Sequence, residues 1–281
     1  MSRPHTRLRA LAALAAAAVA AVAQSSPAGY DFEREVVAQQ HPYPAQEDVR
    51  ILKLYEGLRV ADVSDAMDLV GLMGSGLVSA EIKPLWRDLD DFSHRIQGIA
   101  MTARYQRTNR PIPRLSPEEY DQWRGKWYAT LSKEHFVPLI RPGMVLVIEA
   151  SEDGDSGTIG SNNTMNWKLK GLRGVVSSGG ARDTDEIMKE KVPVYTARIT
   201  RGYPPGRNEL ESVNRPVTVG GVLVHPGDVV VADGDGVVVV PRRYAEPVAA
   251  WARKILDGDK QSRRGLYDKL GLPPDKSVLP D

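Results

Sequence analysis

The sequence predicts an α/β fold with a central β-α-β-α-β unit and C-terminal β-hairpins. In the middle of the chain, apolar runs of strand length alternate with segments of helical periodicity. Near the end, short valine-rich runs are separated by glycine and proline turns, which is typical of hairpins. The 281 residues are 42% apolar and 26% charged, as in folded globular proteins, and the length suits one or two domains.

Residues 1–23 are predicted to be a secretory signal peptide. Arg3, Arg7 and Arg9 precede an apolar run that ends in the small-residue sequence AVA before Gln24. The apolar run is shorter than the roughly 20 residues that a membrane-spanning helix needs. We therefore expect export, to the periplasm or the outside, and no stable membrane insertion after cleavage. An uncleaved anchor is the alternative.

The charge and cysteine content exclude several classes of function. Without residues 1–23 the chain has 34 basic and 36 acidic residues, a net charge of −2 with neutral histidines. This balance leaves no basic surface for nucleic acid, so no nucleic-acid partner is expected. The chain has no cysteine, which excludes disulfides and thiolate chemistry and suits an oxidising compartment.

The two ends of the chain are predicted to lie outside the packed domain. Residues 24–47 are interrupted by Pro27, Gly29, Pro42 and Pro44, which predicts an N-terminal arm. The packed domain is expected over residues 48–257, followed by a polar tail over residues 258–281. Its first elements are two helices and a strand, predicted over residues 48–55, 60–70 and 96–105.

A helical insertion is predicted at about residues 106–138. The sequence SPEE at residues 116–119 is a good helix start, with a serine cap and proline at the first helical position. The helix is expected to continue to about Lys133. Its aromatic residues, among them Trp123 and Trp127, recur at helical spacing, which favours packing against the body or another subunit. A substrate lid is the alternative interpretation.

The central unit alternates strands and helices, which predicts parallel strands joined by right-handed crossovers. The elements are expected over residues 144–149, 162–170, 172–177, 184–190 and 192–199. Antiparallel hairpin strands and a closing helix follow, over residues 217–219, 222–224, 229–232, 237–240 and 244–256.

Two turns of the central unit carry the candidate site residues, because ligands of open α/β sheets bind where parallel strands end. The first turn is GTIGSNN, residues 157–163, in which glycines allow close backbone approach and the next helix offers unpaired N–H groups to an anion. A simpler interpretation is that Ser161 or Asn162 only caps that helix.

The second turn, SSGGARDTDE at residues 177–186, contains Arg182 and Asp183. Asp183 with Glu186 also fits a helix-capping box, which needs no catalysis. Arg182 beside a glycine-rich turn is well suited to bind a carboxylate with both ends of its guanidinium, and Asp183 offers oxygen to a hard cation. Together they predict a site for a small, metal-bound oxo acid.

Other motifs point to no chemistry. Residues 233–236, DGDG, lack the ligand spacing of a calcium loop and are better interpreted as a hairpin turn. The histidines lack the spacing of zinc ligands, and the serines lack a nucleophile-elbow motif, so neither a zinc enzyme nor a serine hydrolase is indicated.

The run from Gly160 to Asp183 resembles the RraA-like family, which includes 4-hydroxy-4-methyl-2-oxoglutarate aldolase and regulator of ribonuclease activity A. The resemblance is carried by GLRGVV at residues 171–176 and GGARD at residues 179–183. VSDAM at residues 63–67 and PGDVVVADGDGV at residues 226–237 support it. It covers roughly residues 48–257.

The resemblance implies a swivelling β/β/α sandwich that assembles as a homotrimer or hexamer, with sites near subunit interfaces. It implies a lyase that uses Mg²⁺ or Mn²⁺ to release pyruvate from a small 2-oxo acid, by aldol cleavage of a 4-hydroxy-2-oxo acid or decarboxylation of oxaloacetate. Asp183 would hold the metal, largely through water, and Arg182 would be catalytic, facing the pyruvate carboxylate or enolate oxygen. Backbone amides of Gly160, Ser161, Asn162 and Asn163 would bind the carboxylate.

One position departs from the family pattern. Aldolases of the family carry an acidic residue about twenty positions before the arginine, where this chain has Ser161, and a serine cannot serve as a carboxylate base. The resemblance therefore predicts the metal site more firmly than the substrate. A non-catalytic, oligomeric binding or regulatory protein is the alternative function.

Overall fold

The computed structural model describes residues 30–150 and 154–279. The predicted signal peptide and the start of the predicted arm, residues 24–29, lie outside the described residues. Within the described part of the chain, no helix combines the length and apolar character needed to cross a membrane.

A ten-stranded sheet forms the centre of the molecule, in the order β1-β8-β3-β4-β6-β7-β2, with β5 beside β6 and the β11–β12 hairpin beside β3. The strands are β1 (Val37–Ala38), β2 (Lys83–Pro84), β3 (Ile96–Arg107), β4 (Met144–Glu149), β5 (Gly157–Ile159), β6 (Gly174–Ala181), β7 (Val194–Ile199), β8 (Asn208–Val213), β11 (Val229–Asp233) and β12 (Gly236–Val240). A second, two-stranded sheet joins β9 (Val217–Val219) to β10 (Val222–Val224).

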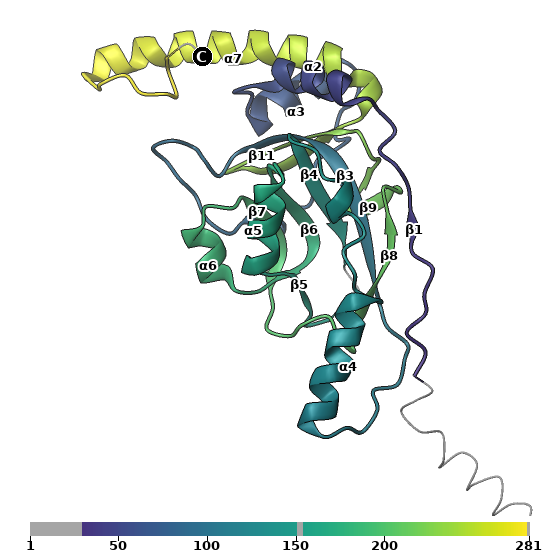
Figure 1. Ribbon diagram of the computed structural model, residues 1–281. Coiled ribbons are helices and arrows are strands. Elements are labelled where there is room, and N and C mark those ends of the chain that lie inside the picture. Colours follow the sequence, from purple (N-terminus) through teal and green to yellow (C-terminus); the bar gives the residue numbers. More distant parts are fainter. Residues whose placement is uncertain (1–29, 151–153, 280–281) are drawn as a thin grey trace, which may run out of the picture.

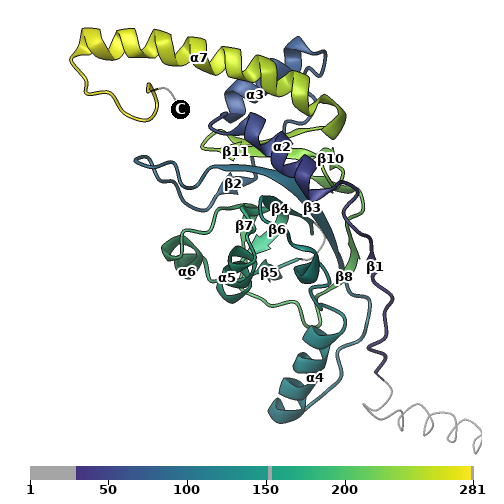
Figure 2. The same ribbon diagram turned by 45° about the horizontal axis from the view of Figure 1, so that its top comes forward.

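Helices cover the sheet in separate groups (Figure 1). The long α7 (Ala245–Leu270) lies over α2 (Ala45–Tyr55) and α3 (Val60–Leu69), and Figure 2 shows the same layer from a tilted view. On the other side lie α5 (Ser161–Leu169) and α6 (Thr184–Lys189), whereas α4 (Pro117–Ala129) projects from the opposite end of the molecule. Short 3-10 helices occupy Val137–Leu139 (η2) and Arg242–Tyr244 (η3).

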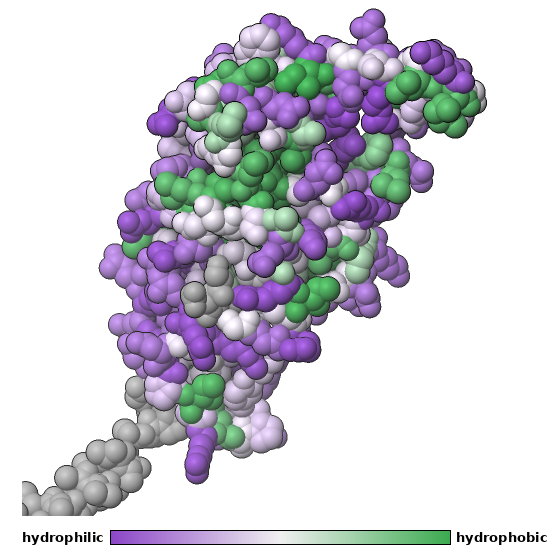
Figure 3. Space-filling model, turned by 180° about the vertical axis from the view of Figure 1, so that it is seen from behind, coloured by the Kyte–Doolittle hydropathy of each residue, from purple (hydrophilic) through white to green (hydrophobic). Residues whose placement is uncertain are grey.

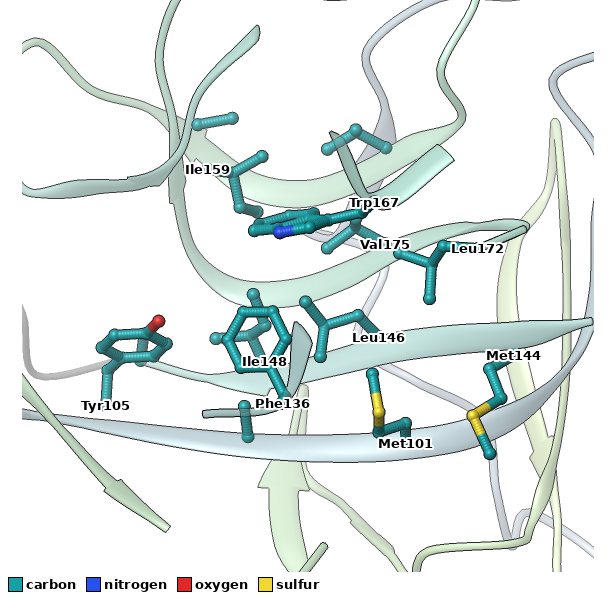
Figure 4. Packing of buried hydrophobic residues seen from close by; sticks show 14 of the residues in the cluster. Met101, Tyr105, Phe136, Met144, Leu146, Ile148, Ile159, Trp167, Leu172 and Val175 are labelled. Carbon is teal, nitrogen blue, oxygen red and sulfur yellow. The ribbon is translucent and has the colours of Figure 1, made fainter. Parts of the chain in front are cut away.

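The central unit has the predicted parallel order. β4 pairs in parallel with β6, and β6 pairs in parallel with β7, with α5 and α6 between successive strands. All eight residues of β6 are buried, because helices and the second sheet cover both faces. The core beneath α5 is aromatic and aliphatic: Phe136 and Trp167 meet nearly edge to face, with ring centroids 5.5 Å apart (Figure 4).

The predicted C-terminal hairpins are confirmed. β9 pairs antiparallel with β10, and β11 pairs antiparallel with β12. Asp233 lies opposite Gly236, so the acidic DGDG segment is a tight hairpin turn. The Asp233 carboxylate accepts a hydrogen bond of 2.9 Å from the backbone N–H of Val60, at the start of α3.

The helix start at Ser116 and the packing of α4 are also confirmed. The Ser116 hydroxyl accepts from the N–H of Glu119, and the Glu119 carboxylate accepts from the N–H of Ser116. Trp123 and Trp127 are buried in a cluster with side chains of the arm, Tyr30 and Phe32. The arm is thus held by this cluster and by the pairing of β1 with β8.

The structure contains strands that were not predicted, and several predicted boundaries differ from it. β6 continues to Ala181, so residues 177–181 of the predicted second turn are strand. β8 was not expected, and β5 lies within the segment predicted to be a turn. The helix of the insertion ends at Ala129, earlier than Lys133. The closing helix continues past residue 256 to Leu270, through Gly258 and Gly265, and Gly271 ends it in the left-handed conformation at φ 66°.

Candidate active site

The two predicted turns lie side by side. β5 and β6 are parallel neighbours whose register pairs Ile159 with Ala181, so the residues that follow each strand emerge together. The backbone N–H of Arg182 donates to the carbonyl of Ile159 at 2.9 Å. The structure therefore brings Arg182 and Asp183 against the Gly160 turn at the carboxyl ends of parallel strands, where open α/β sheets bind ligands.

The Asp183 carboxylate faces the neighbouring helix rather than its own. Asp183 adopts the left-handed conformation at φ 55° and makes no side-chain cap to α6. Its Oδ2 instead accepts from the backbone N–H of Ser161, at 3.3 Å, in the first turn of α5. The alternative of a capping box between Asp183 and Glu186 is therefore wrong, because the backbone at Asp183 turns the carboxylate away from α6.

The first turn of α5 has no side-chain cap. Gly160 is the N-cap residue, so the interpretation that Ser161 or Asn162 caps the helix is wrong. The first N–H groups of a helix have no partner inside it, and here the Ser161 N–H is taken by Asp183. The predicted binding residues Gly160, Ser161, Asn162 and Asn163 therefore lie together, with helix N–H groups directed away from the helix.

Two glycines of the site allow the turns to approach each other closely. A Cβ on Gly160 would lie 2.9 Å from Oδ2 of Asp183, and a Cβ on Gly157 would lie 2.7 Å from Cγ of Arg182. Both distances are shorter than an ordinary carbon contact. The absence of side chains at these two positions lets the second turn lie directly on the first.

Arg182 forms an ion pair with Asp183 but remains partly exposed. Its Nε donates to Oδ1 of Asp183 at 3.2 Å, and the two side chains are 34% and 36% exposed. Among the described residues, the terminal nitrogens of Arg182 have no hydrogen-bond partner, and its guanidinium carbon lies 6.0 Å from the ring centre of Tyr203. The guanidinium therefore retains donors for an anionic ligand.

The residues present suit a hard cation held mainly by water. Across residues 30–150 and 154–279, no group of three or more histidine, cysteine or acidic side chains could enclose a metal ion. Asp183 supplies one accessible carboxylate at the turn. Mg²⁺ keeps several waters and is often bound through one or two carboxylates. A single carboxylate therefore suits Mg²⁺, whereas it would not suit an ion that needs ligands from the protein alone.

The insertion contributes residues that the sequence did not reveal. A cavity of about 420 Å³ beside α5 is lined by Asn162, Asn163 and Thr158, and also by Tyr128 and Glu134 from the insertion. Asn163 donates to the Glu134 carboxylate, which also accepts from the indole N–H of Trp167 at 2.9 Å. No local motif marks Glu134 or Tyr128; only the fold brings them to α5. A larger cavity of about 710 Å³, beneath α7, contains none of the predicted site residues.

Fold and turns together define an α/β protein with a candidate site at the carboxyl edge of parallel strands. A model of the RraA-like family, described as Aldolase/RraA, matches residues 60–239, and the chain therefore belongs to this family. The architecture is the RraA-like one. Streptomyces coelicolor RraAS2, an unusual member of the RNase ES inhibitor RraA protein family, superposes with a TM-score of 0.62, 24% identity and coverage of 77% of this chain and 98% of its own.

Other relatives are similar at modest identity. A protein of Halalkalibacterium halodurans with the provisional name 4-hydroxy-4-methyl-2-oxoglutarate aldolase is 31% identical over 129 residues, which are 46% of this chain and 61% of that protein. The match thus spans less than two thirds of that relative. An uncharacterised protein from Pseudomonas syringae superposes with a TM-score of 0.59, 25% identity and coverage of 88% of this chain and all of its own.

Proposed function

We propose that this protein is a divalent-metal-dependent lyase that acts on a 2-oxo acid, by aldol cleavage of a 4-hydroxy-2-oxo acid or by decarboxylation of the oxaloacetate type. One observation carries the proposal: the Asp183 carboxylate, turned away from α6, lies beside the Arg182 guanidinium and against the first turn of α5. Relatives that carry the aldolase name support the reaction class.

In the proposed reaction, backbone N–H groups of the first turn and Arg182 of the second turn bind the substrate. The N–H groups of residues 160–163 that Asp183 leaves free and the terminal nitrogens of Arg182 bind the carboxylate and the 2-oxo group. In aldol cleavage the C3–C4 bond breaks and the 4-hydroxyl loses its proton as it becomes a carbonyl. The electron pair moves to the oxygen at C2, and the resulting pyruvate enolate takes a proton at C3. Arg182 stabilises the negative charge as it develops.

Asp183 is the proposed ligand of Mg²⁺ or Mn²⁺, largely through water. When bound, such an ion acts as a Lewis acid that stabilises charge on the substrate oxygens. Ser161 supplies no carboxylate base, so the proton of the 4-hydroxyl leaves through water or another group.

We also propose self-association and export. The back of the molecule carries an apolar surface patch (Figure 3), and the exposed large apolar side chains include Met73, Leu77 and Leu223. Exposed apolar patches often mark protein interfaces, which supports a homotrimer or hexamer. Export rests on residues 1–23 of the sequence alone.

The test is pyruvate release from oxaloacetate and from 4-hydroxy-4-methyl-2-oxoglutarate with Mg²⁺. Arg182→Ala should lower kcat/KM by about 10² to 10³ because it removes a preorganised donor. Arg264→Ala, in α7, is the matched control and should leave the rate unchanged, because within residues 30–150 and 154–279 that arginine pairs only with Asp268 on the same helix. Equal rates for wild type and Arg182→Ala would contradict the proposal. Absence of Mg²⁺ binding together with one stoichiometric protein partner would favour a non-catalytic binding protein.

A further inference from the structure

The cavity between α5 and the insertion is polar and lacks basic groups. Its lining includes the hydroxyls of Tyr105, Tyr128 and Thr158, the amides of Asn162 and Asn163, and the carboxylate of Glu134, and no lysine, arginine or histidine lines it in the described part of the chain. At about 420 Å³ it has the size of a small-molecule site.

One threonine of the cavity lining has a hydroxyl without a partner among the described residues. Thr158 is 6% exposed, and its Oγ1 is buried without a hydrogen bond to any described residue. A buried polar atom without a partner is costly, typically about 1 to 3 kcal/mol. Thr158 lies on β5, two residues before Gly160, and is a lining residue of the cavity, which adjoins the proposed oxo-acid site through Asn162 and Asn163.

Glu134 makes the inner part of the cavity unfavourable for a second anion. Its carboxylate accepts from Asn163 and Trp167, and burial raises its pKa above the ordinary value. A substrate carboxylate placed beside it would lose water, meet another acidic group and find no cation in the lining. Hydroxyl groups, in contrast, both donate and accept hydrogen bonds, as this lining requires.

The positive charge lies at the end of the cavity near the two turns. Arg182 does not line the cavity, but Asn162 and Asn163 of the lining follow directly on Ser161, whose backbone N–H donates to the Asp183 carboxylate that pairs with Arg182. An oxo acid is therefore oriented with its charged head towards Arg182 and its tail towards Glu134.

We propose that the cavity selects a 4-hydroxy-2-oxo acid whose tail carries hydroxyl groups, as in a deoxy sugar acid, rather than a second carboxylate. This inference rests on the proposed lyase function and names its substrate class. For a six-carbon substrate of this kind, breakage of the C3–C4 bond yields pyruvate and glyceraldehyde. The 4-hydroxyl gives up its proton to become the aldehyde carbonyl, and C3 gains a proton. No oxidant or co-reactant is consumed.

The experiment compares pyruvate release from two probes with Mg²⁺: 2-keto-3-deoxygluconate, which has a hydroxylated tail, and 4-hydroxy-4-methyl-2-oxoglutarate, which has a second carboxylate. We expect kcat/KM to be at least about tenfold higher for the hydroxylated probe, the effect of one well-placed hydrogen bond or more. A preference for the dicarboxylate would overturn the inference and leave the lyase function intact. Pyruvate release from neither probe, and none from oxaloacetate, would overturn both.

Two variants test whether the cavity itself is responsible. Thr158→Val keeps the shape but removes the unpartnered hydroxyl, and should lower kcat/KM about tenfold for the hydroxylated probe alone. Glu134→Gln keeps the size and removes the acid, and should raise kcat/KM for the dicarboxylate. A circular dichroism spectrum and Tm like those of wild type establish that each variant is folded. Equal effects of Thr158→Val on both probes would contradict selection by this cavity.

Discussion

Replacement of Gly160 by alanine tests how closely the two turns must fit. The added Cβ would lie 2.9 Å from Oδ2 of Asp183, so the carboxylate has to retreat by about 0.5 Å to reach an ordinary contact. The backbone at Gly160, with φ −135° and ψ 165°, is accessible to alanine, so the main effect falls on the carboxylate.

The expected loss of activity follows from this displacement. A misplacement of about 1 Å at a reacting group costs about 10² in rate, so half that distance should lower kcat/KM about tenfold. The free energy of unfolding should change by less than about 1 kcal/mol, the usual difference between glycine and alanine at an N-cap. The assay is Mg²⁺-dependent pyruvate release, with urea unfolding measured in parallel.

Gly265→Ala is the matched control. Gly265 lies in α7, and a Cβ there meets nothing within 4 Å, so activity should be unchanged. If Gly160→Ala retains wild-type kcat/KM, the position of the Asp183 carboxylate does not matter and the reasoning is refuted. A loss of activity that matches the loss of folded protein would refute it equally.

Three further predictions concern stability and metal binding. Trp127→Ala should lower the free energy of unfolding by about 3 to 5 kcal/mol in urea titrations, because Trp127 is fully buried and its indole N–H donates to Ser132 and to the Asn208 carbonyl; an effect below 1 kcal/mol would contradict this. Mg²⁺ should raise the Tm of wild type and of Asp185→Asn but not of Asp183→Asn, as scanning calorimetry would show. Burial raises the pKa of Glu134 above its ordinary value of 4.5 in the folded protein, so the stability that its protonated form contributes is complete below pH 4.5 and is lost as the pH rises through the folded-state pKa. Urea titrations at several pH values should therefore show the free energy of unfolding of wild type falling, relative to that of Glu134→Gln, as the pH rises through this range. A difference between the two proteins that does not change with pH would contradict the raised pKa.

The fold was largely predictable because its strands and helices are locally consistent. The valine-rich hairpins and the alternating central unit carry strong periodicity, and a strand over residues 172–177 was predicted with its parallel neighbours, although β6 continues to Ala181, within the predicted turn. β5 could not be predicted, because its three residues, GTI, are few and stand directly before Gly160, so that only their pairing with β6 defines them as a strand. β8 has the sequence NELESV, whose polar residues give no apolar run.

The sequence predicted which residues form the candidate site, but not how their side chains are directed or which distant residues join them. The sequence placed Arg182, Asp183 and residues 160–163 at strand ends, and the parallel pairing of β5 with β6 brings them together. It could not show that the left-handed backbone of Asp183 directs the carboxylate to α5. Nor could it show that Glu134, more than twenty residues before α5, would line a cavity with Asn163, because that contact depends on how the insertion packs.

A crystal structure grown with Mg²⁺ and pyruvate tests the central claim most directly. The account predicts an octahedral Mg²⁺ with several waters beside Asp183, and the pyruvate carboxylate between the terminal nitrogens of Arg182 and the first N–H groups of α5. Arg182 and Asp183 still paired only with each other, with metal and pyruvate absent from the turn at concentrations that support turnover, would contradict it.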